Sequence, residues 1–179
     1  MNDVRMVGKI LDKLHPYDGS AYKVQTRRSG NKEVYDEIAV VLPSLFDITI
    51  GQIYQFYGTL GVRPQIRAKE KIDICVYVKN MHNISQDEEL FNEVFINGTI
   101  MSIDKDPKIP NKMSLLLNAD DDSYDKYKVV AWGKRLNYLK YKKVGDHLRI
   151  SGELVKYVYR VNTETFFHTE IIFWFEEPK

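Results

Sequence analysis

Hydrophobic residues gather in short runs in which apolar and polar positions tend to alternate. Five such runs lie in the first half of the chain, at residues 4–10, 21–26, 33–42, 52–58 and 71–78. They are rich in Val, Ile, Tyr and Phe and are bounded by turn residues, a pattern that predicts β-strands. A polar and acidic stretch, Asn83–Leu90, follows them and is expected to be a linker.

The pattern then starts again, 90 to 97 residues further along the chain. Gly8 in the first run has its counterpart in Gly98. The matching segments are 4–10 with 94–100, 37–41 with 128–132, 51–58 with 145–152, and 74–78 with 171–175. Four matches in the same order predict two copies of one unit, residues 1–83 and 91–179.

Each copy is expected to have five strands, with a short helix between the third and the fourth. In the second copy this helix is expected at residues 135–141, because Leu136 and Leu139 fall on one helical face and Gly145 follows as a stop signal. Five strands with a helix at this point are the arrangement of the OB fold, a partly open Greek-key barrel. Glycines inside the strands suit the bends of a small barrel. The sequence therefore predicts an all-β protein of two tandem OB-fold barrels, each with a short helix between strands 3 and 4.

Composition places the chain in the ordinary range for a globular protein. Of its 179 residues, 44% are hydrophobic, and no apolar run approaches the roughly 20 residues that cross a bilayer. The first residues lack the apolar stretch of a secretion signal. Cys75 is the only cysteine, so no internal disulfide forms. These features favour the cytoplasm.

The net charge of +1 neither supports nor excludes binding of nucleic acid. Its distribution is more informative. Residues 1–83 hold 12 basic and 9 acidic residues, a net charge of +3, and the rest hold 14 and 16, a net charge of −2. Attraction for phosphate should therefore be local, and stronger in the first half.

Three segments of the second copy, 92–98, 129–134 and 141–154, carry a family resemblance. They look like the first strand, the end of the third strand and the fourth strand of the bacterial single-stranded DNA-binding proteins, which the second copy resembles over about residues 91–176. The primosomal replication proteins share this barrel and are a close second match. The resemblance implies a non-enzymatic, sequence-tolerant binder of single-stranded DNA in replication or recombination, which needs no cofactor or metal.

Two further expectations follow from this resemblance. The family commonly gathers four barrels around one strand of DNA, which a chain of two barrels would reach as a homodimer. Its usual chain also continues into a flexible tail with an acidic tip that recruits partners. The present sequence ends at residues 176–179, directly after the last predicted strand, so recruitment through such a tail is not expected.

Binding of a single strand needs cations for the phosphates and flat side chains for the bases. In the second copy, alternation places Lys128 and Trp132 on the face opposite Val129 and Ala131. The same parity unites Arg149, Tyr157 and Tyr159 in the fourth strand. Trp132 and Tyr159 also match base-stacking positions of the resembled family, although either ring could instead cap a barrel or pack in an oligomer interface. Trp174, within an apolar run, is expected in the core or an interface.

In the first copy, candidate residues lie in two hairpins that flank the binding face of OB barrels. The basic candidates are Lys23, Arg27, Arg28, Arg63, Arg67, Lys69 and Lys71, and the aromatic ones are Tyr22, Tyr35 and Tyr57. Solvated loops are the plain alternative for the charged hairpins. Val41 stands where the second copy has Trp132, so affinity in this half would rest more on charge than on stacking.

Other functions leave weaker signals. Asp120-Asp121-Asp122 lacks the glycine and the distal glutamate of a calcium loop, and the four histidines have no zinc spacing. No phosphate loop or nucleophile motif supports an enzyme. A scaffold that docks other proteins is the main alternative to DNA binding, and RNA or an oligosaccharide also fits an OB barrel.

Overall fold

The computed structural model describes residues 2–14, 20–31, 33–62, 74–120, 125–161 and 164–176. Most of this part of the chain is β-strand. The strands are β1 (Asn2–Lys13), β2 (Ala21–Arg27), β3 (Tyr35–Val41), β4 (Ile53–Gly61), β5 (Cys75–Asn83), β6 (Phe91–Asp104), β7 (Lys112–Ala119), β8 (Lys126–Trp132), β9 (His147–Val161) and β10 (Glu164–Glu176). Two short helical turns, η1 (Gly133–Arg135) and α1 (Leu136–Leu139), lie between β8 and β9.

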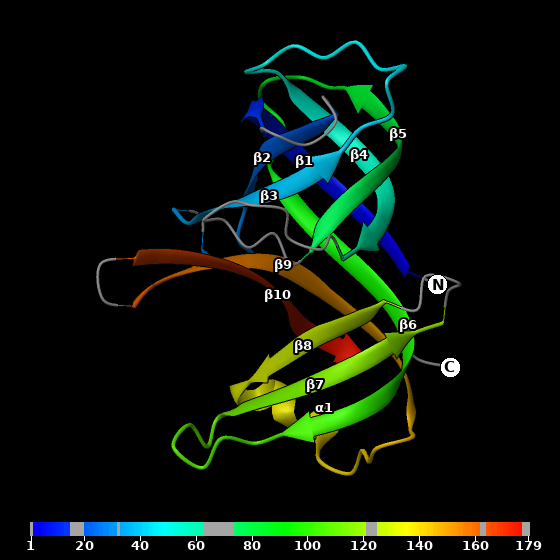
Figure 1. Ribbon diagram of the computed structural model, residues 1–179, viewed down its shortest axis with the longest axis vertical. Coiled ribbons are helices and arrows are strands. Elements are labelled where there is room, and N and C mark those ends of the chain that lie inside the picture. The colour runs from blue at the N-terminus through cyan, green and yellow to red at the C-terminus, as the bar shows by residue number, and fades with distance from the viewer. Residues whose placement is uncertain are drawn as a thin grey trace.

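The strands form two sets of five, and each set closes on itself (Figure 1). In the first set the order is β1-β2-β3-β5-β4, and β4 pairs with β1 again. In the second set the order is β6-β7-β8-β10-β9, and β9 pairs with β6 again. In both sets the third strand runs parallel to the fifth and every other pair is antiparallel. The prediction of an all-β protein with OB-type barrels is confirmed.

Hydrogen bonds at the end of each first strand repeat almost atom for atom. The Gly51 amide donates to the Ile10 carbonyl over 2.8 Å, and the Gly145 amide donates to the Ile100 carbonyl over 2.9 Å. Both glycines have a positive φ, 88° and 92°. Residues that carry a side chain adopt this backbone conformation only with strain. The repeat read from the sequence is thus a repeat of backbone geometry.

Glycines inside the fourth strands allow a close approach of the fifth. A Cβ atom on Gly58 would lie 2.2 Å from the Tyr77 carbonyl oxygen, and one on Gly152 would lie 2.4 Å from that of Ile172. No side chain fits at such distances. These two glycines therefore serve the contact between strands as well as their curvature.

Inward-facing side chains fill both barrels, and the largest that are fully buried are Phe56, Tyr127 and Phe173. Cys75 is buried in β5 and packs as a small hydrophobic residue, as expected.

An antiparallel ladder between β1 and β6 joins the two barrels. It pairs Asn2 with Ile96, Val4 with Val94, and the residues between and beyond them as far as Val7 with Phe91. One hydrogen-bonded sheet of ten strands therefore runs through the described residues. Sequence patterns gave no sign of this ladder, and the division into residues 1–83 and 91–179 stays a prediction. Asn83, the first residue of the expected linker Asn83–Leu90, ends β5, and residues 84–90 connect β5 to β6.

The expected helix between strands 3 and 4 is present in one barrel only. In the second barrel η1 and α1 occupy residues 133–139, and the side chain of Leu139 at the end of α1 is buried. In the first barrel the prediction is wrong, because residues 42–52 form turns, closed by hydrogen bonds from Phe46 to Pro43 and from Gln52 to Thr49. Pro43 and the β-branched Ile48, Thr49 and Ile50 make this segment a poor helix former.

Candidate nucleic-acid interface

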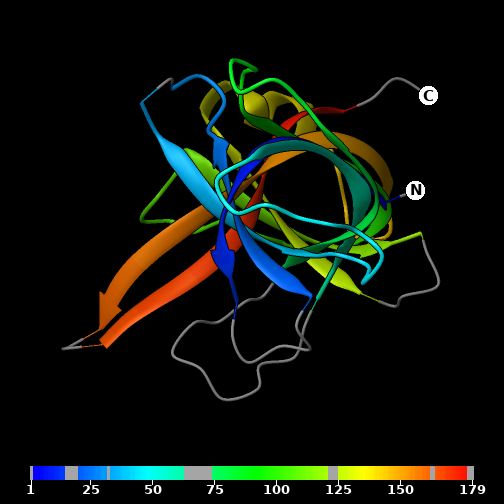
Figure 2. The ribbon, with the colours of Figure 1, turned by 90° about the horizontal axis from the view of Figure 1, so that it is seen from above.

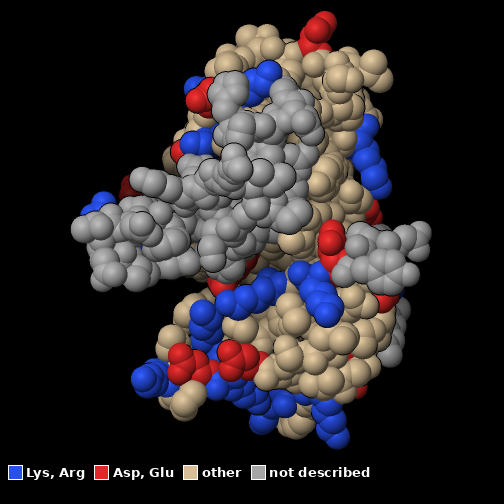
Figure 3. All heavy atoms as spheres, viewed as in Figure 1, with Lys and Arg blue, Asp and Glu red and all other residues tan. Residues whose placement is uncertain are grey.

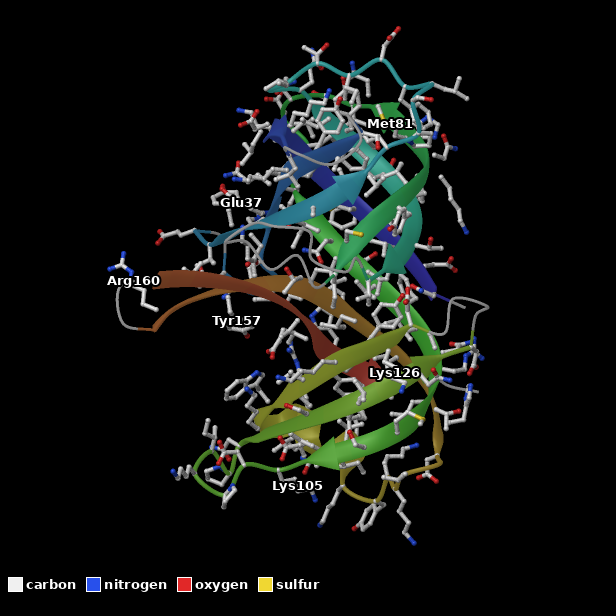
Figure 4. All side chains as sticks on the ribbon, in the orientation of Figure 1. Glu37, Met81, Lys105, Lys126, Tyr157 and Arg160 are labelled. Atoms are coloured by element: carbon white, nitrogen blue, oxygen red, sulfur yellow. The ribbon has the colours of Figure 1, made fainter. Side chains whose placement is uncertain are left out.

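The outer face of β7 and β8 brings basic and aromatic side chains together. Burial along β7 alternates strictly, so every second side chain points outward. The register places Lys112 beside Trp132, Leu116 beside Lys128, and Asn118 beside Lys126. Figure 3 shows Lys and Arg side chains gathered over this barrel on the face that carries the two strands, and Lys126 is labelled in Figure 4.

Trp132 ends β8 at the edge of this face. Its backbone is extended, and Gly133 with φ of 57° turns the chain into the helical segment. The residue is 38% exposed, and the Lys112 ammonium lies 5.2 Å from the centre of its ring. Val129 and Ala131 are fully buried, as predicted for the core face. Val130, which alternation places on the same face as Lys128 and Trp132, is buried too, because Val155, Ile172 and Tyr157 cover it. The base-stacking role of Trp132 stays a prediction.

Lys128 lies on the outer face but forms an ion pair. Its ammonium is 2.7 Å from Oε1 of Glu170, a carboxylate that is buried on β10. A buried carboxylate needs such a partner. Part of the lysine's charge is therefore offset before any phosphate approaches.

The long β9–β10 hairpin extends beyond its barrel and passes below β3 of the other (Figures 1 and 2). Tyr157 is half-buried on it, packs against Val130, Val155 and Ile172, and lies 5.9 Å below the Arg28 guanidinium. Burial raises the pKa of the Tyr157 hydroxyl, and the charge of Glu170 adds to the effect. Tyr157 thus packs between the barrels more than it faces solvent.

The remaining length of the hairpin carries the exposed Arg160, which is labelled with Tyr157 in Figure 4. Tyr159 belongs to β9, but its side chain lies outside the described residues.

Each barrel's fourth strand contacts the other barrel through a carboxylate. The Lys156 amide on β9 donates to Asp36 over 2.9 Å, and the Val62 amide after β4 donates to Asp125 over 3.3 Å. The Arg28 guanidinium donates two hydrogen bonds to the Asp36 carboxylate, of 3.0 and 2.6 Å. This pairing raises the pKa of Arg28. The predicted phosphate ligand Arg28 is therefore part of the contact between the barrels.

Glu153 adds a further contact at the same place. This buried carboxylate accepts a hydrogen bond from the Ser29 amide over 2.8 Å and one from the Trp174 indole over 3.3 Å. Burial raises the pKa of Glu153, against the opposing effect of those two hydrogen bonds. Trp174 is half-buried and lies at this contact between the barrels.

The other described basic candidates of the first barrel are paired with carboxylates. Lys23 lies 3.4 Å from Glu37, which also receives Lys156 over 3.5 Å. Arg27 pairs with Glu89 of the connecting segment. The predicted stronger attraction of the first half for phosphate has no support in these residues. Arg63, Arg67, Lys69 and Lys71 lie outside the described residues.

Two candidates lie apart from β7 and β8. Tyr57 on β4 is 38% exposed, contacts His82 edge-on, and lines a groove with residues of β1, β5 and β6. Arg149 is exposed on the part of β9 that pairs with β6, opposite Asn97.

Sequence reasoning missed Lys112 and Lys126, which complete the outer face, and Lys105 and Lys108 in the loop before β7. Lys126 shares the parity of Lys128 and Trp132 and could have been found from it. Lys112 could not, because the second strand of the second copy was not among the matched segments. Only the register of β7 on β8 places Lys112 at the Trp132 ring.

Among the described residues, no group of three His, Cys, Asp or Glu side chains is arranged to hold a metal ion. Asp120 pairs instead with His147. No helix in the described part of the chain has the length and apolar character needed to cross a membrane.

Comparison with known proteins adds two solved structures. No family model matches the chain, and no curated protein matches it. The single-stranded DNA binding protein from Thermus aquaticus matches with a TM-score of 0.65 and 18% identity, over 100% of this chain and 93% of that one. A deletion mutant of the same protein matches with a TM-score of 0.68 and 19% identity, over 100% and 94%. The likeness covers both barrels and confirms the resemblance at the level of the fold.

Proposed function

We propose that this protein binds single-stranded DNA without strong sequence preference and without catalysing a reaction. The observation that carries the proposal is the exposed Trp132 at the end of a row of outward lysines, Lys112, Lys126 and Lys128. β7 and β8 are the second and third strands of their barrel, the face on which OB folds bind oligonucleotides. The shared fold with the single-stranded DNA binding protein from Thermus aquaticus supports the same activity.

The chemistry of this face suits a flexible polyanion. An indole stacks on any base because every base has a π-face, and lysines act as point charges along the backbone. Neither device reads sequence. A role in DNA replication or recombination is the corresponding biological proposal.

Salt should weaken the binding in proportion to the phosphates contacted. For single strands, the slope of log affinity against log salt is about −0.7 per phosphate. The described face carries three lysines, and Lys128 is already paired with Glu170, so we expect only a few contacts per chain. Titrating labelled oligo-dT at several salt concentrations measures the slope.

Lys126→Gln should make that slope shallower by about 0.7, whereas Lys143→Gln, in the loop after α1, should leave it unchanged. A slope near zero for the unaltered protein would show that phosphate contacts do not drive the binding.

We further propose that the chain assembles as a homodimer, bringing four barrels together. Closed two-fold assemblies are the commonest oligomers. Sedimentation should report about twice the chain mass of 21.0 kDa. A mass of one chain at micromolar concentration would rule the homodimer out.

RNA and protein partners are the competing ligands. Competition between poly-dT and poly-U separates DNA from RNA directly. The near-neutral charge and the ion pairs of the first barrel favour a protein scaffold instead. Absence of both poly-dT and poly-U binding at low salt would refute our proposal and favour that alternative.

A further inference from the structure

A groove lies between α1 and the loop that joins β6 to β7. It has a volume of about 480 Å³, within the range of sites that hold small organic ligands. Its apolar lining comes from Pro107 and Pro110 of the loop, Met113 of β7 and Leu136 of α1.

The two walls of this groove are tied together by the backbone. Within the loop, the Ile109 amide donates to the Asp106 carbonyl, and the Lys112 amide donates to the Ile109 carbonyl, both over 3.0 Å. The Gly133 amide then donates to the Asn111 carbonyl over 2.9 Å, linking the loop to the start of the helical segment. The groove is therefore a formed part of the fold.

Its charge is suited to an anion. Lys105, Lys112 and Lys140 all line it, against a single carboxylate, Asp106, whose Oδ1 already accepts a hydrogen bond from the Lys108 amide over 2.8 Å. Lys112 is also the lysine that lies over the Trp132 ring. The groove and the outer face of β8 thus share a cation and continue one another.

The first barrel supplies an internal comparison. A groove at the corresponding place, between the start of β2 and the segment after β3, has a volume of about 230 Å³. Its lining includes Tyr22, Leu42, Pro43, Phe46 and Ile48, and none of its described lining residues is Lys or Arg. Within the described residues, which leave out 15–19 between β1 and β2, the basic lining belongs to the groove of the second barrel.

We propose that this groove takes one nucleotide of the bound single strand, next to the nucleotide that stacks on Trp132. The base lies against the prolines and Leu136, the phosphate lies among the three lysines, and the Asn137 amide meets the polar edge of the base. This inference rests on the proposed function and adds to it a second base site, on the helical side of the barrel.

The test compares Lys140→Glu with Lys143→Glu, which makes the same change of charge outside the groove. Both side chains are exposed, so both variants should fold. Lys140→Glu should weaken binding of labelled oligo-dT by about tenfold, the loss of one charged hydrogen bond, and should shorten the oligonucleotide length at which affinity stops rising. Lys143→Glu should change affinity much less, and the uncharged Asn137→Ala should weaken it severalfold.

The outcomes separate the two proposals. If Trp132→Ala weakens binding but Lys140→Glu and Asn137→Ala do not, the groove proposal fails and the DNA-binding proposal stands. If Lys140→Glu and Lys143→Glu weaken binding equally, the loss of affinity reflects only the overall charge of the protein, and the groove proposal is overturned. Failure of the unaltered protein to bind oligo-dT overturns the proposed function itself. If Lys140→Glu abolishes binding of labelled hexaglutamate yet leaves oligo-dT binding intact, the groove is a peptide site.

Discussion

Replacing Trp132 by alanine should weaken the binding of oligo-dT by about five- to more than a hundredfold. The indole is exposed at the end of β8 and supported by Lys112 over its ring. Loss of a stacking platform costs about 1–3 kcal/mol per base, and about 1.4 kcal/mol is a factor of ten in affinity. Fluorescence anisotropy with labelled oligo-dT measures the change.

The matched variant Trp132→Phe keeps an aromatic face and should retain most of the affinity. Circular dichroism should show both variants folded, because Trp132 lies outside the core. Trp174→Phe leaves Trp132 as the sole indole, whose fluorescence DNA should quench. An alanine variant that folds and binds normally would refute the stacking role and strengthen the scaffold alternative.

Asn92→Ala should lower the free energy of unfolding by about 2–4 kcal/mol, since a buried donor or acceptor left unsatisfied costs about 1–3 kcal/mol. The Asn92 side chain is buried at the β1–β6 ladder. It donates to Thr26 Oγ1 over 3.1 Å and to the Leu154 carbonyl over 3.2 Å, and accepts from the Leu154 amide over 2.5 Å. Urea unfolding measures the loss.

Its counterpart Asn2 makes the same kind of contacts, with Leu60 and with Tyr127 of the other barrel. Asn2→Ala should therefore cost a similar amount. Asn97→Ala, on the outward side of β6, is the control and should cost much less. If both buried variants unfold like the unaltered protein, the two asparagines do not stabilise the joint between the barrels.

Strand patterns and glycine spacing were enough to predict the fold because they report local backbone geometry. Gly51 and Gly145 adopt a positive φ. At Gly58 and Gly152 the neighbouring strand leaves no room for a Cβ atom. Such requirements survive divergence between the two copies. The first-barrel helix failed for the opposite reason, since it was transferred from the second copy to a segment with Pro43 and β-branched residues.

The candidate site was predictable only in part. Alternation placed Trp132 and Lys128 on the outer face, because period two follows from the strand itself. Alternation could not reveal the ion pairs of Lys128 with Glu170 and of Arg28 with Asp36. Both carboxylates are buried on other strands, and only the folded structure brings each one to its basic partner. Lys112 depended on the register of a strand that the matches had not located.

The ladder between β1 and β6 has a consequence for the origin of the chain. Val4 pairs with Val94, its own counterpart in the repeat, so a single ancestral barrel could pair with an identical copy in the same register. The polypeptide has the form of such a two-fold dimer whose halves are joined through residues 84–90, the arrangement that duplication and fusion of one gene would produce. Once both barrels belong to one chain, their sequences can diverge. One half could then keep an open basic face on β7 and β8, while Arg28 of the other half came to contact Lys156 and Tyr157 between the barrels.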